Sequence, residues 1–285
     1  MSGAFLSNAH THTRYCDGKN TVDEMVEAAI RLGFVSLGFS EHGAQGFDAH
    51  YSMDGGRQEA YLAELRAPQA RHQGREGMPR IWIGVEQDAL TPKDQKKKNR
   101  EELDYVLGST HYASRGFRGK CVPVDGDVDL LRAYVEETYT GDMLAMAQAY
   151  FDDHVKMLLN DRPDIIGHFD VVCKNAHLYR MFDPDGVAYR KMALNALEAA
   201  RACGGVLEVN TGGMARGALV EPYPSRELLQ AWREMGGEVT LTSDCHDAAF
   251  LDYAFEREWK ALKALGYGRV LRLGMGSTLW EEMEL

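Results

Sequence analysis

The stretch Asn8-Ala9-His10-Thr11-His12-Thr13 follows the short apolar run Ala4-Phe5-Leu6 and carries two histidines one residue apart. Side chains alternate between the two faces of an extended segment, so His10 and His12 point to the same side. Imidazole is the commonest protein ligand for zinc and similar metals. The pair, with Asp17 close behind it, therefore predicts a metal site at the end of a short buried strand.

Six further segments have the length and composition of buried strands. They cover residues 35–39, 81–85, 105–110, 164–167, 206–209 and 239–243. Helical patterns fall between several of them, at 21–32, 142–159, 190–203, 225–235 and 248–265. This alternation predicts parallel β-α-β units, with seven strands in all. The segment 113–139 has no clear pattern, and we expect a long loop there that is a candidate lid over the site.

Five of the six further strands end in residue types that bind metals. These residues are His42, Glu86, His111, His168, and Asp244 with His246. Parallel α/β folds place the carboxyl ends of their strands on one face, where active sites lie. Any one of these histidines, taken alone, is more often a hydrogen-bonded structural residue than a ligand. Because all of them stand at equivalent positions, we expect them to converge with His10 and His12 on one metal cluster. His154, among apolar helical residues, is instead expected in the core or on a helix surface.

Composition limits the alternatives. The chain has 285 residues with 45% hydrophobic content, which suits one large domain spanning residues 1–285. Its net charge of -11 disfavours a general nucleic-acid-binding surface, and the basic run 93–100 is expected to be a solvated loop or helix face. Five cysteines without a Cys-x-x-Cys pair indicate a reducing compartment. No membrane span or signal pattern is evident, so the cytoplasm is the expected location.

The motifs at the strand ends resemble those of the PHP (polymerase and histidinol phosphatase) superfamily. They are His10-Thr11-His12, Ser40-Glu41-His42, Glu86, Gly108-Ser109-Thr110-His111, Gly167-His168-Phe169-Asp170 and Asp244-Cys245-His246. The resemblance covers nearly the whole chain and keeps the motif order. Within the superfamily, Leu207-Glu208-Val209-Asn210-Thr211 and Pro222-Tyr223-Pro224-Ser225 are similar to a late motif of the monofunctional histidinol-phosphate phosphatases.

This resemblance implies a distorted seven-stranded β/α barrel that holds two or three divalent metal ions. One metal would take His10, His12, Glu86 and Asp244; a second would take Asp17, His42 and His246; a third would share Glu86 and take His111 and His168. Asp17 stands where some members carry histidine. Nitrogen and oxygen donors without thiolate fit zinc, iron(II) or manganese. The catalytic residues implied are Asp17, His42, Glu86, Asp244 and His246.

The implied activity is hydrolysis of L-histidinol phosphate, a small phosphate monoester. The phosphate charge that the metals do not neutralise calls for cationic donors. Arg216 and Lys174 follow strand ends, where they can bind the phosphate. Two rivals stay open: a phosphodiesterase or exonuclease acting on nucleotides or DNA ends, and a metal-stabilised scaffold without turnover. Oligomeric state, metal identity and the general acid are left open. Candidates for recognising the imidazole and amino group are Asp125, Asp127, Glu136 and Glu137, although most of these side chains are expected to face solvent.

Overall fold

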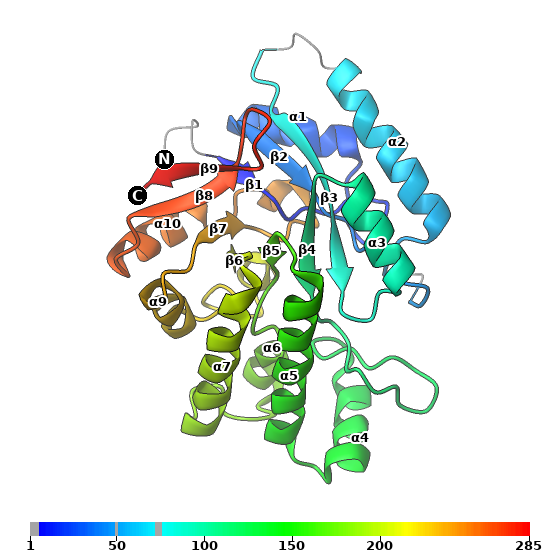
Figure 1. Cartoon of the computed structure of the whole chain (residues 1–285), viewed down its shortest axis with the longest axis vertical. Helices are drawn as coiled ribbons and strands as arrows, with labels where there is room; N and C mark the ends of the chain where they lie inside the picture. Colours follow the sequence, from blue (N-terminus) through cyan, green and yellow to red (C-terminus); the bar gives the residue numbers. More distant parts are fainter. Residues whose placement is uncertain (1–5, 49–50, 72–75) are drawn as a thin grey trace.

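The structure is a computed structural model that describes residues 6–48, 51–71 and 76–285 (Figure 1). Its strands form one sheet whose spatial order is the order of the chain, from β1 to β9. Neighbours from β1 to β8 pair in parallel, and β9 is antiparallel to β8. The strands are β1 Ser7–Asn8, β2 Ser36–Phe39, β3 Arg80–Asp88, β4 Tyr105–Ser109, β5 Ile165–Ile166, β6 Val206–Asn210, β7 Val239–Thr242, β8 Arg269–Leu273 and β9 Trp280–Glu284.

The chain beyond β7 returns to the chain beyond β1, which curls the sheet into a distorted barrel. The His12 N–H donates to the Cys245 carbonyl at 2.9 Å, and the Cys245 N–H donates to the His10 carbonyl at 3.0 Å. Thr11 and Cys245 thereby form a parallel bridge. The predicted seven strands and the α/β class are confirmed, and this bridge brings the first and the last of the seven together at the end that carries the histidines.

The strand count needs one correction, because β8 and β9 were not predicted. Their charged residues do not look like buried strands, yet Arg272 of β8 is buried and pairs with Glu281 of β9 at 2.9 Å. The pair makes the buried charge tolerable. β8 also closes the amino-terminal end of the sheet, where the Ser36 hydroxyl donates to the Leu273 carbonyl at 2.6 Å.

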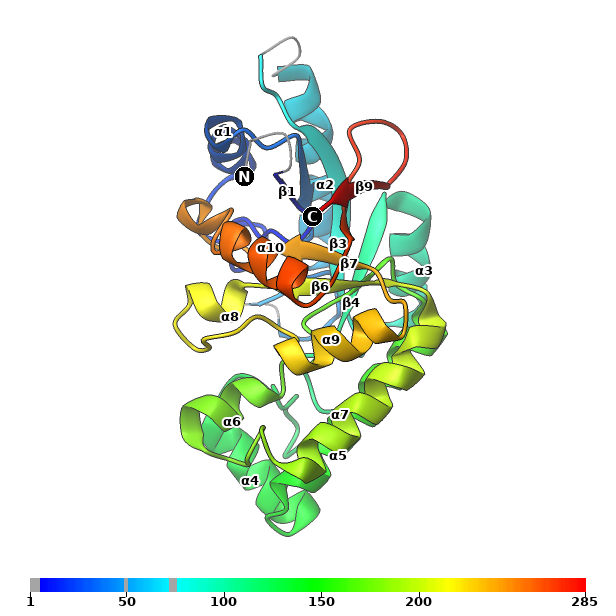
Figure 2. The same cartoon turned by 90° about the vertical axis from the view of Figure 1, so that its left-hand side faces the viewer.

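Helices cover the outside of the sheet (Figures 1 and 2). They are α1 Val22–Leu32, α2 Gly55–Arg71, α3 Lys93–Glu102, α4 Val128–Tyr139, α5 Met143–Asp161, α6 Cys173–Tyr179, α7 Val187–Ala200, α8 Gly212–Ala215, α9 Arg226–Glu234 and α10 Phe255–Ala264. The helices predicted at 21–32, 142–159, 190–203 and 225–235 are confirmed with small shifts at their ends, and the basic run 93–100 lies in α3. Among the described residues, no helix combines the length and apolar character that crossing a membrane requires.

Three stretches of the chain differ from the sequence prediction. The segment 113–139 is not a loop throughout, because Asp127 caps α4, whose Leu131, Tyr134 and Val135 are buried. The segment 248–265 is two pieces, a short 3-10 turn and α10, since Ala254 adopts a left-handed φ of 60° between them. Helix α2 was missed, and its composition is polar with no clear apolar stripe.

The interior of the barrel is filled by a separate apolar cluster. It consists of Ala9, Trp82, Tyr105, Leu107, Ile165 and Leu273. The Tyr105 hydroxyl donates to the Ala9 carbonyl at 2.7 Å, so the ring spans from β4 to the chain beyond β1. Gly84 of β3 leaves the room that this ring occupies. This apolar cluster packs inside the barrel and supports the strand ends that carry the predicted ligands.

Substitution of Gly84 tests this packing. A Cβ atom there would lie 2.4 Å from the Tyr105 ring, so Gly84→Ala should lower the free energy of unfolding by about 1–3 kcal/mol. Gly268→Ala is the matched control, because no atom lies within 4 Å of its added Cβ and its φ is not left-handed. Equal stability of the two variants in denaturant unfolding would contradict the packing described.

His154 is fully buried in α5, as predicted for a core position, and its Nδ1 lies 3.0 Å from the Thr110 hydroxyl. Burial, helped by His168 and His111, lowers the pKa of His154 from 6.5 to about 3. Between these values the unfolded chain binds the proton and the folded chain does not. The free energy of unfolding should therefore fall as the pH drops below 6.5, by ~1.4 kcal/mol per pH unit from this residue.

His154→Leu removes this titration, so it isolates the contribution of one residue from that of the rest of the chain. Its deficit in unfolding free energy relative to wild type should shrink by about 2 kcal/mol between about pH 7 and about pH 5. Denaturant unfolding at the two pH values measures it. A deficit that does not change with pH would show that the buried imidazole is not kept neutral.

Candidate metal centre

The carboxylate of Glu86, at the carboxyl end of β3, is the point on which four histidines converge. One oxygen lies 2.8 Å from His42 Nδ1 and 3.2 Å from His10 Nε2. The other lies 2.9 Å from His168 Nε2 and 3.1 Å from His111 Nε2. The Glu86 side chain is only 1% exposed. Strand ends far apart in sequence therefore meet at one buried anionic group, as the sequence predicts.

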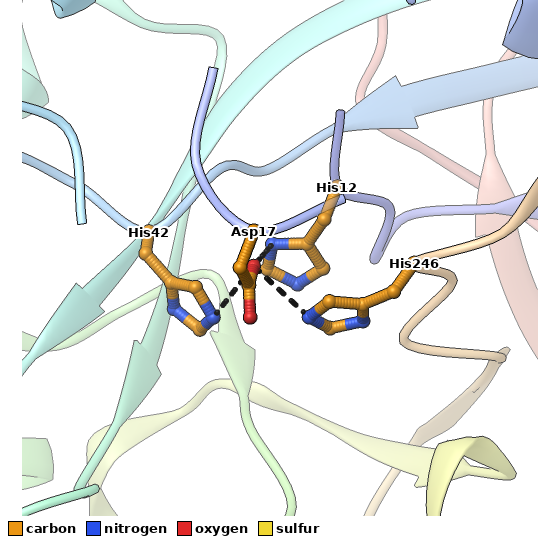
Figure 3. A group of neighbouring side chains, drawn as sticks. All are labelled: His12, Asp17, His42 and His246. Carbon is orange, nitrogen blue, oxygen red and sulfur yellow. Dashed lines mark ion pairs between the residues drawn. The ribbon is translucent and has the colours of Figure 1, made fainter. Parts of the chain in front are cut away.

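A second group forms around Asp17, in the loop that follows β1 (Figure 3). Its Oδ1 lies 3.1 Å from His246 Nε2, 3.6 Å from His42 Nε2 and 4.0 Å from His12 Nδ1. The donor atoms of these four residues all lie within 4.8 Å of one another. The expected set of Asp17, His42 and His246 is thus assembled, with one edge of the His12 ring beside it.

Asp244 completes the arrangement from the end of β7. Its Oδ1 lies 3.3 Å from His12 Nε2 and 3.6 Å from His10 Nε2. His12 Nε2 is also 3.6 Å from Glu86. The four residues predicted for the first metal therefore face one another, and all nine predicted ligands lie in one continuous cluster.

The chemistry of the donor atoms fits divalent cations. The Nε2 atoms of His10, His12 and His42 and one oxygen of Glu86 are buried and have no hydrogen-bond partner among the described residues. Buried polar atoms are normally paired, so several orphans pointing at one place indicate a group that they bind. Nitrogen and oxygen donors without thiolate suit zinc, iron(II) or manganese.

The electrostatics of the cluster favour the metal-binding forms of His12 and Glu86. Burial, together with His246 and His42, lowers the pKa of His12 to about 3, which leaves its imidazole neutral. Burial by itself would raise the pKa of Glu86, but the neighbouring His111, His42 and His10 hold it well below its ordinary value. Neutral imidazole and ionised carboxylate are the forms that bind metals. Against the effect of burial, Glu208 and Glu86 raise the pKa of His10, and Glu86 and Asp88 raise the pKa of His111, so a metal would displace protons from these two imidazoles.

Glu208, in the middle of β6, is a functional residue that the sequence analysis did not assign. It is fully buried, and its Oε2 lies 2.9 Å from His10 Nδ1. Its other oxygen accepts the backbone N–H of His168. A carboxylate on Nδ1 fixes the tautomer of His10 and turns Nε2 toward the cluster. A charged residue inside an apolar strand could have been recognised from sequence, because a buried charge needs partners.

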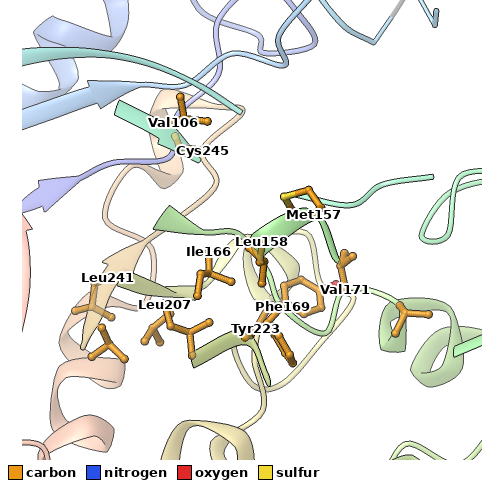
Figure 4. Close-up of a cluster of buried hydrophobic side chains, with 14 of the residues drawn as sticks. Val106, Met157, Leu158, Ile166, Phe169, Val171, Leu207, Tyr223, Leu241 and Cys245 are labelled. Carbon is orange, nitrogen blue, oxygen red and sulfur yellow. The ribbon is translucent and has the colours of Figure 1, made fainter. Parts of the chain in front are cut away.

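Asp88 supports His111 in the same way, two residues after Glu86 on β3. Its Oδ2 accepts the backbone N–H of His111 at 2.8 Å and lies 3.3 Å from His111 Nδ1. Phe169, which follows His168, is buried in the apolar core beside Leu158 and Ile166 (Figure 4). The ring positions are therefore set by packing and by carboxylates behind the cluster.

Both predicted phosphate-binding residues reach the site. They line a cavity of about 230 Å³ together with all the predicted ligands except His10 and His12, and its lining also includes Tyr51, Val171 and Tyr223. Arg216 lies 2.9 Å from Asp244 Oδ2, and Lys174 lies 2.9 Å from Asp125 Oδ2. Each cation is thus held by one carboxylate at the edge of the cluster.

Four acidic residues were considered for recognising the imidazole and amino group of the substrate. Of these, only Asp125 lines this cavity. Asp127 caps α4, and Glu136 and Glu137 are exposed, with Glu137 pairing Arg118. These three residues face solvent, as expected for most of the four, and only Asp125 stays a candidate. The reason is the helix in this segment, which turns them away from the barrel.

Glu208→Gln tests the supporting role of that carboxylate. Loss of its charge behind His10 should weaken metal affinity about 10–100-fold, because such partners fix the orientation and basicity of the ligand. Competition with a chromophoric chelator measures the affinity. The exposed Glu198→Gln on α7 is the control and should match wild type. Equal affinity in the two variants would show that Glu208 only fills space.

Relatives with assigned names resemble the chain over most of its length. It is 28% identical to the "Probable histidinol-phosphatase" of Deinococcus radiodurans over 268 residues, covering 92% of this chain and 94% of that relative. It is 23% identical to the protein of the same name in Schizosaccharomyces pombe, covering 84% of this chain and 80% of that relative.

Solved structures share the fold. The hisK protein of Listeria monocytogenes superposes with a TM-score of 0.72 at 18% identity, covering 88% of this chain and 98% of that one. Histidinol phosphate phosphatase from Lactococcus lactis, solved with zinc, L-histidinol and phosphate, gives a TM-score of 0.63 at 18% identity, covering 94% and 96%. The family model of the PHP domain matches residues 8–212, well over half of the chain. With the metal-ligand motifs in the family's order, the chain belongs to the PHP domain family.

Proposed function

We propose that this chain is a metal-dependent phosphomonoesterase that hydrolyses L-histidinol phosphate to L-histidinol and phosphate. The observation that carries the proposal is the continuous cluster of nine ligand-type side chains with Arg216 and Lys174 at its edge. The names of the relatives in Deinococcus radiodurans and Schizosaccharomyces pombe support the reaction class. The Lactococcus lactis structure, with zinc, L-histidinol and phosphate, supports the substrate.

The ligand groups in this proposal are those of the sequence prediction. One metal would be held by His10, His12, Glu86 and Asp244, a second by Asp17, His42 and His246, and a third by Glu86, His111 and His168, whose side chains lie close together. When bound, divalent ions supply positive charge that offsets the phosphate dianion and they acidify water near neutral pH. Asp17, His42, Glu86, Asp244 and His246 all line the cavity. We therefore propose these five as the residues closest to the reaction.

Arg216 and Lys174 are proposed to hold the phosphate. Arg216 donates from Nη2 to the Asp244 carboxylate at 2.9 Å and from Nη1 to the Asp244 carbonyl at 3.3 Å. Its side chain is 42% exposed, so the other N–H donors of the guanidinium can face the cavity. The Lys174 ammonium is shared with Asp125 and has donors beyond that contact. Both cations therefore reach a bound anion without giving up the carboxylates that position them.

The remaining lining of the cavity suits the other end of the substrate. Asp125 supplies negative charge, and Tyr51 and Tyr223 supply aromatic faces. A cationic amine and an imidazole match such a lining. A cavity of about 230 Å³ also suits a small monoester better than a polynucleotide strand.

The rest of the prediction goes with this proposal. Residues 1–285 act as a single domain, without nucleic acid as a partner. The matched length of the relatives supports the single domain, and the prediction about nucleic acid rests on the net charge of -11. A cytoplasmic location is a prediction from the cysteine pattern, and the oligomeric state is left open.

The substrate is tested by phosphate release from a panel at equal metal and neutral pH. L-histidinol phosphate should be hydrolysed with at least about a hundredfold higher kcat/KM than nucleoside monophosphates, diesters or single-stranded DNA, since only it places a cation near Asp125. A preference for a diester or for DNA would overturn the proposal and leave the metal centre intact.

Arg216→Ala tests the phosphate clamp. Its kcat/KM should fall about a hundredfold or more, through both KM and kcat, because the guanidinium contacts the phosphate before and during reaction. Metal content should stay near that of wild type. Arg118→Ala, which removes an exposed arginine paired with Glu137, is the control. Wild-type kinetics in Arg216→Ala would show that this arginine only stabilises Asp244.

A further inference from the structure

Two tyrosines, Tyr51 and Tyr223, line the active-site cavity, and their hydroxyl groups differ. Tyr223 is 1% exposed, and its hydroxyl is sealed from solvent. Tyr51 is only partly buried, and its hydroxyl is not sealed in this way. The Tyr51 hydroxyl also has no hydrogen-bond partner in the part of the chain that the structure describes. It is therefore a free donor that a molecule in the cavity can reach.

The ring of Tyr51 is fixed against two predicted metal ligands. It stacks on the His42 imidazole with a centroid distance of 3.8 Å and an interplanar angle of 29°. It also meets His111 in a T-shaped contact, with a centroid distance of 5.7 Å and an angle of 73°. His42 belongs to the proposed second metal group and His111 to the third. The Tyr51 side chain therefore lies where these two groups adjoin.

The backbone around Tyr51 is tied to the ends of β2 and β4. The Tyr51 N–H donates to the Asp48 carbonyl at 3.0 Å, and the Met53 N–H donates to the His42 carbonyl at 2.9 Å. The Asp48 carboxylate accepts the Tyr112 hydroxyl at 2.7 Å. These bonds hold the phenol in place before a ligand binds, and donors that are positioned in advance are the effective ones in catalysis.

The chemistry of the cavity indicates which end of the substrate the phenol contacts. Asp244 accepts from Arg216 and Asp125 accepts from Lys174, each at 2.9 Å, so these carboxylates already have partners. A phenol keeps its proton at neutral pH, so Tyr51 offers a hydrogen bond without adding charge. The amine end of the proposed substrate is a donor itself, whereas the phosphate carries several acceptor oxygens. The phosphate is therefore the matching end.

Tyr51 and Arg216 belong to different sides of the site. Figure 3 shows His42 and His246 on opposite sides of Asp17. Tyr51 packs on His42, whereas Arg216 is bonded at the strand end that carries His246. A phosphate in the cavity can thus receive the guanidinium from one side and the phenol from the other.

We propose that Tyr51 is a further catalytic residue, whose hydroxyl donates a hydrogen bond to a phosphate oxygen of the substrate. The inference rests on the proposed phosphomonoesterase function and adds a neutral donor to the two cations assigned above. Its role is to hold the phosphoryl group in the orientation for attack. Because the ring packs on His42 without using the hydroxyl, Tyr51→Phe separates the two contributions.

Inorganic phosphate is the first probe, because its binding does not depend on which ester is the substrate. Isothermal titration of phosphate into the metal-loaded full chain should give a Kd about tenfold higher for Tyr51→Phe than for wild type, as expected for the loss of one hydrogen bond to a charged group. The metal content of the variant should equal that of wild type. Tyr179→Phe, at an exposed tyrosine of α6, is the matched control and should bind phosphate like wild type.

Turnover provides the second readout. Tyr51→Phe should lower kcat/KM about tenfold for L-histidinol phosphate and by a similar factor for 4-nitrophenyl phosphate, since both carry the same phosphate group. A loss confined to L-histidinol phosphate would overturn the inference, because the hydroxyl would then contact the other end of that substrate. Wild-type phosphate affinity in Tyr51→Phe, or a loss explained by missing metal, would also overturn it. A wild-type preference for diesters would instead contradict the proposed function, and the phosphate titration would still decide the role of Tyr51.

Discussion

The structure depends on a buried carboxylate shared by four imidazoles. Glu86 is almost without solvent, and His10, His42, His111 and His168 each approach it within 3.2 Å. Removing a carboxylate from water costs several kcal/mol, so the site is favourable only with cations or strong donors around it. The parallel sheet meets this requirement, because each of these residues stands at or just beyond the end of a different strand.

Two features hold the strand ends in register. The bridge between Thr11 and Cys245 joins the chain beyond β1 to the chain beyond β7, next to His10, His12, Asp244 and His246. Behind the cluster, Glu208 and Asp88 orient His10 and His111 through Nδ1. The bridge and these two carboxylates hold the side chains of the cluster in fixed positions. The geometry for binding multivalent cations is therefore already formed by the protein itself.

Much of this centre was predictable because its information is local. A strand followed by histidine or carboxylate is visible in a short window, and parallel topology then brings such windows together. Helix α1 was equally clear, since its capping box at Thr21 and Glu24 and its left-handed Gly33 are all present in the structure. The resemblance to the PHP superfamily added the grouping of the ligands, and the family is confirmed.

What could not be predicted depends on distant pairing. The sequence of β8 contains Arg272, whose burial makes sense only beside Glu281 of β9. Helix α4 depends on a buried face that packs against α5, and α2 has too polar a sequence to be recognised. A cavity of about 370 Å³ is lined by α6, α7 and the loop before α9, and it arises from the packing of these elements, so no single stretch encodes it.

The central claim is that Glu86 joins a cluster of metal ions, and metal content per chain tests it most directly. Purified wild-type protein should contain at least two divalent ions per chain by elemental analysis, and Glu86→Gln should lose at least one of them. Glu198→Gln, which changes an exposed carboxylate on α7, should keep the wild-type content. Active wild-type protein without stoichiometric metal, or undiminished content in Glu86→Gln, would contradict the account.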